Sequence, residues 1–304
     1  MGQNLMTLAD ELGLRFPDAR PIAPVKVLGS GFESRVIETP SGIVFKVARG
    51  PEARERLELE CSLLREIATR LPVRIPVPQW QAFDLASAPH GIVGYKKLEG
   101  APLDAAPLTS GRARALGVEI GGFLAGLHAV KPTELATALP TFDPHRLLTP
   151  ALLAGTRDAL VTHATQDELL ALKNWFARAR ERFSCESDRF VLTHGDLWYE
   201  NLLAAPGPRL TGVLDWSNAA LSHRARDFGP LIYKGSEFLD AVARAYAGAT
   251  GREPEDLLAQ APAFLTLREL LGLQWAQKHD SREVPDAIEK VISLLRGGLL
   301  QEAV

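Results

Sequence analysis

The fold is decided by residues 192–201, which read Leu192-Thr193-His194-Gly195-Asp196-Leu197-Trp198-Tyr199-Glu200-Asn201. An apolar run, Phe190–Thr193, precedes the polar part of this stretch and predicts a strand. Asp215 follows Asn201 by fourteen residues, in Val213-Leu214-Asp215-Trp216, at the end of another apolar run, Leu210–Asp215. With a third short strand at Leu202–Ala204, this order would bring Asp196, Asn201 and Asp215 to one edge of a hairpin.

These three side chains are the set that phosphoryl transfer requires. One carboxylate, Asp196, would accept the proton of a hydroxyl, while the amide oxygen of Asn201 and the carboxylate of Asp215 would hold Mg²⁺ against phosphates. The alternative interpretation is three unrelated polar residues in loops, because a His-x-Asp-x₄-Asn pattern alone is only moderately specific. The position between predicted strands favours the site.

A second group of residues lies upstream. Leu28-Gly29-Ser30-Gly31-Phe32-Glu33-Ser34 predicts a glycine-rich turn between two strands, although a flexible hairpin turn is the default explanation for such a segment. Lys46 lies within an apolar strand, where a buried ammonium group requires a partner. Glu60, on the helix that follows, is the natural partner. The alternative for Lys46 is an edge-strand lysine that faces solvent.

Working outward, the first hundred residues read as strands with one helix, and the rest reads as mostly helical. Strands are expected at Val25–Leu28, Ser34–Glu38, Ile43–Val47, Gln79–Phe83 and Ile92–Lys96, with a helix over about 52–70. Later helices are expected near 112–130, 149–161, 166–184, 236–249, 255–279 and 284–301. The fold class is therefore α+β, with a small β-rich lobe over residues 1–96, a hinge at 97–101 and a larger helical lobe over 102–304.

Composition excludes several classes of protein. The 304 residues are 46% hydrophobic and carry a net charge of -3, so disorder is excluded and nucleic-acid binding has little electrostatic support. No apolar run is long enough for a membrane span, and the N-terminus lacks the basic stretch of a signal peptide. Two cysteines, Cys61 and Cys185, suit a reducing compartment better than a disulfide, so we expect a cytoplasmic protein without a membrane partner. Oligomeric state stays open.

The order of these motifs carries a resemblance to a known family. The protein-kinase fold has the same order of motifs: a glycine-rich turn, a lysine in a strand, a glutamate in a helix, an Asp-x₄-Asn segment and an aspartate at the end of a strand. His194-Gly195-Asp196 and Leu214-Asp215-Trp216 resemble the forms that these motifs take in the aminoglycoside phosphotransferase family, over about residues 25–280. The string Gly94-Tyr95-Lys96-Lys97-Leu98-Glu99-Gly100 is most similar to the 2″-aminoglycoside branch, and macrolide kinases belong to the same family. The resemblance implies a protein-kinase-like, two-lobed fold.

The resemblance also implies roles for the nucleotide and metal residues. Lys46, held by Glu60, would contact the phosphates of ATP or GTP, and the backbone of Gly29, Ser30, Gly31 and Phe32 would close over them. The backbone of Lys97 and Leu98 would bind the purine. Asn201 and Asp215 would bind Mg²⁺, and Asp196 would be the catalytic base. Tyr95 would limit the depth of the purine pocket and favour GTP; its alternative is a packed strand aromatic.

Asp227 and His194 are interpreted as structural residues. Asp227-Phe228-Gly229 spells the metal motif of protein kinases but lies too far after Asn201, so we expect Asp227 to tie down the catalytic loop rather than bind metal. His194 is expected to be a hydrogen-bonding residue rather than a catalyst.

An aminoglycoside is the acceptor that the resemblance favours, and a cationic acceptor requires carboxylates between the catalytic loop and the C-terminal helices. The residues considered for this site are Asn218, Glu237, Asp240, Glu269 and Trp275, each of which has a bland alternative as a solvated charge or packed aromatic. A macrolide kinase, a metabolic kinase for a sugar or amino alcohol, and a pseudokinase remain alternatives. The last is disfavoured because Lys46, Asp196 and Asp215 are all present, and a protein kinase is disfavoured because no Ala-Pro-Glu segment follows Asp215.

Overall fold

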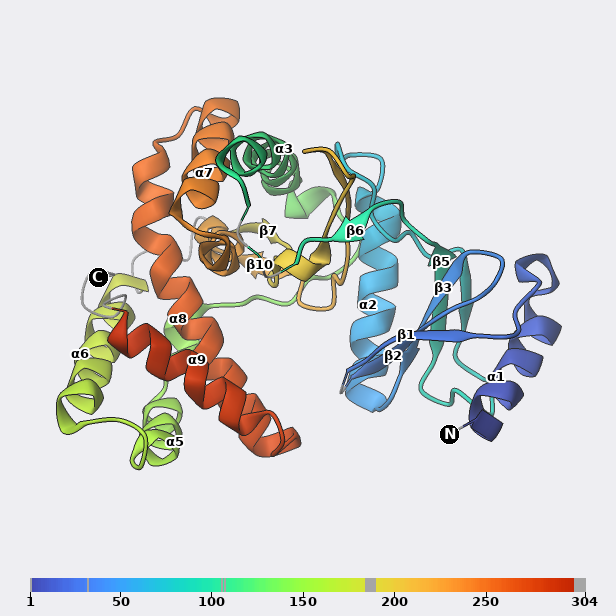
Figure 1. Ribbon diagram of the computed structural model, residues 1–304, viewed down its shortest axis with the longest axis horizontal. Helices are drawn as coiled ribbons and strands as arrows, with labels where there is room; N and C mark the ends of the chain where they lie inside the picture. Colours follow the sequence, from blue (N-terminus) through green and yellow to red (C-terminus); the bar gives the residue numbers. More distant parts are fainter. Residues whose placement is uncertain (1, 32, 105, 107, 184–189, 298–304) are drawn as a thin grey trace.

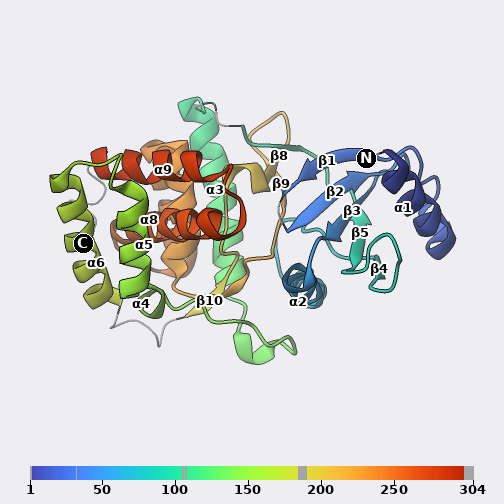
Figure 2. The ribbon, with the colours of Figure 1, turned by 90° about the horizontal axis from the view of Figure 1, so that it is seen from below.

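The computed structural model describes residues 2–31, 33–104, 106, 108–183 and 190–297. They form a β-rich N-terminal lobe and a larger helical lobe, which lie side by side in both ribbon views (Figures 1 and 2). The α+β, two-lobed class expected from the sequence is confirmed. Cys61 is buried and unpaired in the N-terminal lobe, and Cys185 lies outside the described residues.

The N-terminal lobe contains one antiparallel sheet of five strands in the order β1-β2-β3-β5-β4. Its strands are β1 (Lys26–Ser30), β2 (Ser34–Glu38), β3 (Ile43–Ala48), β4 (Trp80–Ala82) and β5 (Ile92–Lys96). All five agree with the expected strands to within a few residues. The sheet is flanked by α1 (Gly2–Arg15) and α2 (Pro51–Ile67).

The alternation of side chains along β3 places its lysine. Phe45 and Val47 point to the face that Leu8 and Leu12 of α1 cover, where they form one apolar cluster. Because successive strand residues point to opposite faces, Lys46 lies on the other face, toward α2. The sheet therefore separates the apolar cluster with α1 from the face that carries the Lys46 ammonium group.

Helix α1 corrects the expectation that this lobe contains only one helix. Leu5, Leu8 and Leu12 provide an apolar stripe at helical spacing, but the first fifteen residues are short and begin without a capping signal. The helix is stabilised by the sheet face that it buries, since Leu8 and Leu12 are almost fully buried. Its existence thus depends on a tertiary contact.

The C-terminal lobe consists of helices around two short sheets. The helices are α3 (Ser110–His128), α4 (Pro144–Leu147), α5 (Pro150–Leu160), α6 (Gln166–Phe183), α7 (Ser236–Thr250), α8 (Pro254–His279) and α9 (Val284–Arg296). The 3₁₀ turns of this lobe are η2 (Pro132–Glu134), η4 (Tyr199–Asn201), η5 (Arg224–Asp227) and η6 (Gly229–Lys234), and η1 (Pro17–Ala19) lies in the N-terminal lobe. The strands are β6 (Ala101–Pro102), β7 (Val191–Thr193), β8 (Leu202–Ala204), β9 (Leu210–Val213) and β10 (Ala220–Ser222). None of the described helices has the length and apolar character to cross a membrane.

Two apolar clusters organise this lobe. In the first, α3 packs closely on α7 because Gly117 and Gly121 of α3 leave room for Ala241 and Ala245; a Cβ on Gly117 would come within 2.5 Å of Ala241. In the second, α5, α6 and α9 pack around α8. Strands β8 and β9 form the expected hairpin, and β6 joins it to the hinge segment. The hairpin holds the polar loops between the two lobes.

Candidate active site

Lys46 is the link between the sheet, α2 and the β8–β9 hairpin. Its Nζ lies 2.8 Å from Oε2 of Glu60 and 2.9 Å from Oδ1 of Asp215. The second oxygen of Glu60 accepts a hydrogen bond from the backbone N–H of Trp216, at 3.2 Å. Although burial would lower the pKa of Lys46, the two carboxylates raise it above its usual value, so the ammonium group stays charged. The interpretation of Lys46 as a solvent-facing lysine is therefore wrong.

Asp215 adopts an uncommon backbone conformation that aims its carboxylate at this ammonium group. It follows β9 by two residues and has a φ of 56°, in the left-handed region that aspartate enters more readily than most residues. Desolvation would raise the pKa of Asp215, but Lys46 and the hydroxyl of Ser217 lower it to about 2. The carboxylate is therefore anionic and available to a cation at neutral pH.

Asp196 and Asn201 lie at opposite ends of one short loop. The side-chain Nδ2 of Asn201 donates to the backbone oxygen of Asp196 at 3.0 Å, which leaves its Oδ1 free to act as a ligand. The backbone oxygen of Asn201 accepts from Leu214 at 2.8 Å, so Asn201 lies next to the segment that carries Asp215. The three residues that the sequence predicts at one edge of the hairpin are brought together there.

His194 has a structural environment. It is fully buried, its Nε2 lies 2.9 Å from the carbonyl oxygen of Leu214, and its Nδ1 accepts the N–H of Asp196 at 3.3 Å. Its ring also contacts the edge of Trp216, with centroids 4.8 Å apart. His194 thus ties the catalytic loop to the strand that precedes Asp215, as expected.

Asp227 holds the loop that carries His194 and Asp196 through hydrogen bonds to its backbone. Its carboxylate is fully buried and accepts the backbone N–H groups of His194 and Gly195 at 2.9 and 2.7 Å, and it contacts Nε2 of His128 at 3.1 Å. Gly195 has a φ of 86°, and a Cβ there would lie 2.2 Å from the backbone oxygen of Asn218. The loop therefore requires both the glycine and the buried carboxylate, and the structural interpretation of Asp227 agrees with its contacts.

His223, the N-cap residue of the η5 turn that carries Asp227, should make stability depend on pH. Burial, followed by the charge of Arg224, lowers the pKa of His223 to about 3, whereas an unfolded histidine titrates near 6.5. Its contribution to stability is therefore complete above pH 6.5 and is lost as the pH falls toward 3. Between pH 7 and pH 5 we expect this group to reduce the free energy of unfolding by about 2 kcal/mol.

Thermal or urea unfolding at several pH values tests this prediction. His223→Gln removes the titrating group, so the variant should lose less stability than the wild type over that pH range. His163→Gln, which changes an exposed histidine, serves as the matched control. Equal pH dependence in His223→Gln and wild type would contradict the assignment.

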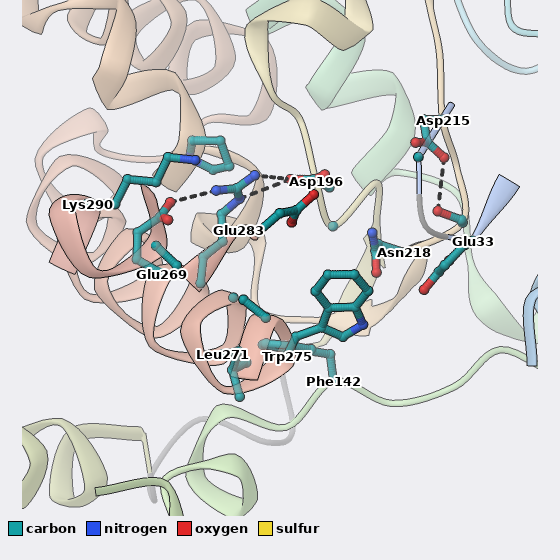
Figure 3. A pocket seen from close by; sticks show the side chains of 18 of the residues that line it. Glu33, Phe142, Asp196, Asp215, Asn218, Glu269, Leu271, Trp275, Glu283 and Lys290 are labelled. Carbon is teal, nitrogen blue, oxygen red and sulfur yellow. Dashed lines mark hydrogen bonds and ion pairs between the residues drawn. The ribbon is translucent and has the colours of Figure 1, made fainter. Parts of the chain in front are cut away.

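A cavity of about 550 Å³ lies between the lobes, and Lys46, Asp196 and Asp215 are among the residues that line it. Figure 3 shows Asp196 with residues of α8 and α9 on one side and Asp215 with Glu33 on the other. Three of the predicted acceptor residues line this cavity: Asn218, Glu269 and Trp275. The structure thus places them beside the proposed catalytic carboxylate.

The structure does not bring Glu237 and Asp240, the other two predicted acceptor residues, to the lining of this cavity. Both are on α7, the helix that packs against α3. Asp240 pairs with Arg244 of the same helix at 2.8 Å, and Glu237 lies half-exposed near Arg114. Helical periodicity shows which face of α7 is buried but not which helix borders the cavity, and that helix is α8, with the start of α9.

Several lining residues were not predicted. Arg268 of α8 contacts Asp196, and Glu283, Asp286 and Lys290 enter the cavity from the start of α9. Arg226 lies over the Phe142 ring at 3.8 Å and beside the catalytic loop. The sequence gives little signal for these residues, because a charged residue in a helical segment is by default a solvated surface group.

The glycine-rich turn borders the cavity from the β-rich lobe. Gly29 and Gly31 border the turn between β1 and β2, where a Cβ would meet nothing within 4 Å at Gly29 and only the backbone oxygen of Ser34, at 3.8 Å, at Gly31. The fold itself therefore does not require these glycines, which suits a loop that approaches a ligand. Ser30 ends β1, and Phe32 lies outside the described residues.

Residues 97–101, the expected hinge, follow β5. Tyr95 is half-buried near the Lys46 group, and burial raises the pKa of its phenol. The backbone N–H of Lys97 donates to the oxygen of Gly42 at 2.9 Å. Because of this bond, only the carbonyl oxygen of Lys97 would be left to contact a purine. Leu98 is half-buried and lies next to Gly212 in the β8–β9 hairpin.

Residues 24–295 match the family model described as the phosphotransferase enzyme family. The chain belongs to the phosphotransferase enzyme family. This assignment confirms the resemblance seen in the His-Gly-Asp and Leu-Asp-Trp motifs, and it makes the chain a phosphotransferase of the kinase type.

Solved structures of similar fold include phosphotransferases for two classes of antibiotic. The GDP complex of wild-type aminoglycoside 2'-phosphotransferase-IIIa has a TM-score of 0.83 at 21% identity, covering 97% of this chain and 100% of that one. A GDP and kanamycin complex of an APH(2″) enzyme has a TM-score of 0.79 at 22% identity, with coverage of 96% and 98%. Macrolide 2'-phosphotransferase MphH from Brachybacterium faecium has a TM-score of 0.66 at 21% identity, with coverage of 95% and 98%.

Two side chains of this phosphotransferase could bind a divalent cation whose remaining ligands come from a phosphate group and water. Among the described residues, no cluster of three His, Cys, Asp or Glu side chains could hold a metal alone. Asp215 and the free Oδ1 of Asn201 provide two oxygen ligands of the type that Mg²⁺ prefers, and Mg²⁺ commonly completes its shell with phosphate oxygens and water. This donor set suits a metal that arrives with a nucleotide.

Proposed function

We propose that the protein transfers the γ-phosphate of ATP or GTP to a hydroxyl group of a small molecule, with Mg²⁺ as cofactor. The observation that carries this proposal is the convergence of Lys46, Asp215 and Asp196 on one cavity between the lobes. Asp196 would orient the acceptor hydroxyl and receive its proton. Lys46 would bind the donor phosphates, and Asn201 and Asp215 would hold the metal, which neutralises charge on the phosphates.

The donor nucleotide would lie against the β1–β2 turn, with its purine at a hinge formed by residues 97–101, between lobes 1–96 and 102–304. The backbone of the glycine turn supplies N–H groups for phosphates. We propose GTP as the preferred donor because the bulky side chain of Tyr95 would narrow the purine pocket. Comparison of kcat/KM for the two nucleotides tests this choice, and a clear preference for ATP would contradict it.

An aminoglycoside is the first acceptor that we propose. Glu269, Glu283 and Asp286 provide carboxylates within the cavity for a polycationic ligand, and Trp275 provides an aromatic surface. Structures of similar fold contain kanamycin and gentamicin. The biological role would then be antibiotic resistance in the cytoplasm.

A macrolide is the second candidate, and the charge pairing within the cavity favours it. Glu269 is already paired with Arg268 at 2.6 Å, and Asp286 with Lys290 at 2.7 Å. These pairs reduce the net negative charge that the cavity offers to a polycation. Phe142, Leu271 and Trp275 add an apolar wall that would suit a ligand with a single amine.

Nucleotide turnover by the purified protein with Mg²⁺ tests the proposal. The panel should contain aminoglycosides, macrolides, and sugars and amino alcohols, each with ATP and with GTP. Stimulation by an aminoglycoside alone supports the first candidate, and stimulation by a macrolide alone supports the second. Turnover only with a metabolite would contradict both antibiotic assignments and leave a metabolic kinase.

A further inference from the structure

Arg268, in the middle of α8, contacts the carboxylate that we propose as the catalytic base. Its Nε lies 3.0 Å and its Nη2 2.9 Å from the same oxygen, Oδ1 of Asp196. The carboxylate is 27% exposed and lines the cavity. In the part of the chain that the structure describes, no other side chain pairs with this carboxylate, so Oδ2 is the oxygen that remains for a ligand.

The guanidinium group of Arg268 is held from two other directions. Its Nη1 lies 2.6 Å from Oε1 of Glu269, whose side chain is almost fully buried. Its central carbon lies 4.8 Å from the centre of the ring of Trp198, two residues beyond Asp196. Dashed lines in Figure 3 end on the carboxylates of Asp196 and Glu269. A planar group with donors on two carboxylates and a face on an aromatic ring has little freedom to rotate.

We infer that Arg268 is a positioning residue for phosphoryl transfer, an inference that rests on the function proposed above. It fixes the Asp196 carboxylate through Oδ1, so that Oδ2 meets the acceptor hydroxyl. The acceptor oxygen forms its bond to the γ-phosphorus as the bond between that phosphorus and the β,γ-bridging oxygen breaks. The hydroxyl proton passes to Oδ2 of Asp196, and the bonding pair leaves with the nucleoside diphosphate.

The same contact has an electrostatic consequence. Asp196 and the terminal phosphate of a bound triphosphate would both be negative within one cavity, and they would repel each other. The guanidinium group beside Asp196 offsets part of that repulsion. Loss of Arg268 should therefore weaken triphosphate binding as well as misplace the base.

The rival interpretation is that Arg268 obstructs Asp196 until a cationic acceptor displaces it. The three contacts of the guanidinium group favour a fixed position instead, because displacement would take the cationic partner away from the buried carboxylate of Glu269. The two interpretations predict opposite results when the side chain is removed.

Kinetics of Arg268→Met separate them. We expect kcat to fall by roughly 10- to 100-fold, as for a misplaced catalytic group, with little change in the acceptor KM. Arg268→Lys should recover part of kcat, and added guanidinium ion should partly restore Arg268→Ala. Arg244→Met is the matched control, since it removes an arginine that pairs with an aspartate on α7, away from the cavity. A kcat for Arg268→Met equal to or above that of the wild type would overturn the inference.

Measuring the affinity for a triphosphate tests the role of Arg268 even if the protein phosphorylates no acceptor. If the wild type transfers phosphate to no acceptor, the proposed function is wrong, and calorimetry with Mg²⁺ and non-hydrolysable analogues of GTP and ATP decides about Arg268. Arg268→Met should then bind several-fold more weakly than the wild type, and the added change Asp196→Asn should restore affinity. Equal affinities of wild type and Arg268→Met would overturn the inference in that case.

Discussion

Asp196→Asn should reduce phosphate transfer by about 10²- to 10⁴-fold, the range that a positioned general base contributes. The substitution retains the volume of the side chain and its place beside Arg268 but removes the proton acceptor. Nucleotide affinity should stay within a few-fold of the wild type, because Lys46 and the β1–β2 turn are unchanged. Steady-state kinetics with the best acceptor of the panel, together with calorimetric nucleotide titration, measure both quantities.

Glu200→Gln is the control for this change. Glu200 is an exposed carboxylate in the same loop, four residues after Asp196, and the same conversion to an amide there should leave kcat unaltered. Activity of Asp196→Asn within a few-fold of the wild type would show that another group accepts the proton.

Asp227→Ala should have the largest effect on stability, a loss of about 3–5 kcal/mol in the free energy of unfolding. The substitution leaves the N–H groups of His194 and Gly195 without their acceptor in a fully buried site. Because these N–H groups belong to the catalytic loop, activity of the folded fraction should fall as well. Urea unfolding measured by fluorescence gives the stability change.

Asp227→Asn distinguishes the charge from the hydrogen bonds. The amide oxygen can still accept from the loop, so this variant should be destabilised less than Asp227→Ala. Asp143→Ala, which removes a half-buried helix-capping carboxylate elsewhere in the same lobe, should have a smaller effect, near 1 kcal/mol. Equal losses in Asp227→Ala and Asp143→Ala would contradict the role of Asp227 as the main support of the loop.

The nucleotide half of the site was predictable because its residues are separated by local, regular structure. The period of two along β3 fixes the face of Lys46, and Glu60 is its natural partner because it lies on the next helix along the chain, α2. Likewise, the hairpin of β8 and β9 forces Asn201 and Asp215 to one end, since antiparallel strands return to the same edge. These contacts follow from patterns within short stretches of chain.

The acceptor half depends on how distant helices pack, which a single sequence does not encode in a readable pattern. Glu237 and Asp240 have the same appearance in the sequence as Glu283 and Asp286, namely acids in the first turns of a helix. Only the tertiary arrangement places α9 beside the cavity and α7 behind α3. Arg268 was missed for the same reason, because nothing in its local sequence links it to Asp196.

The most direct test of this account is the product of the reaction. The purified protein, GTP or ATP and Mg²⁺ should be incubated with the acceptor that stimulates turnover most, and the product analysed by mass spectrometry and NMR. We expect an acceptor that has gained one phosphoryl group on a hydroxyl oxygen, and no such product with Asp196→Asn. Tight nucleotide binding without a phosphorylated product from any acceptor of the panel would contradict it and would indicate a pseudokinase.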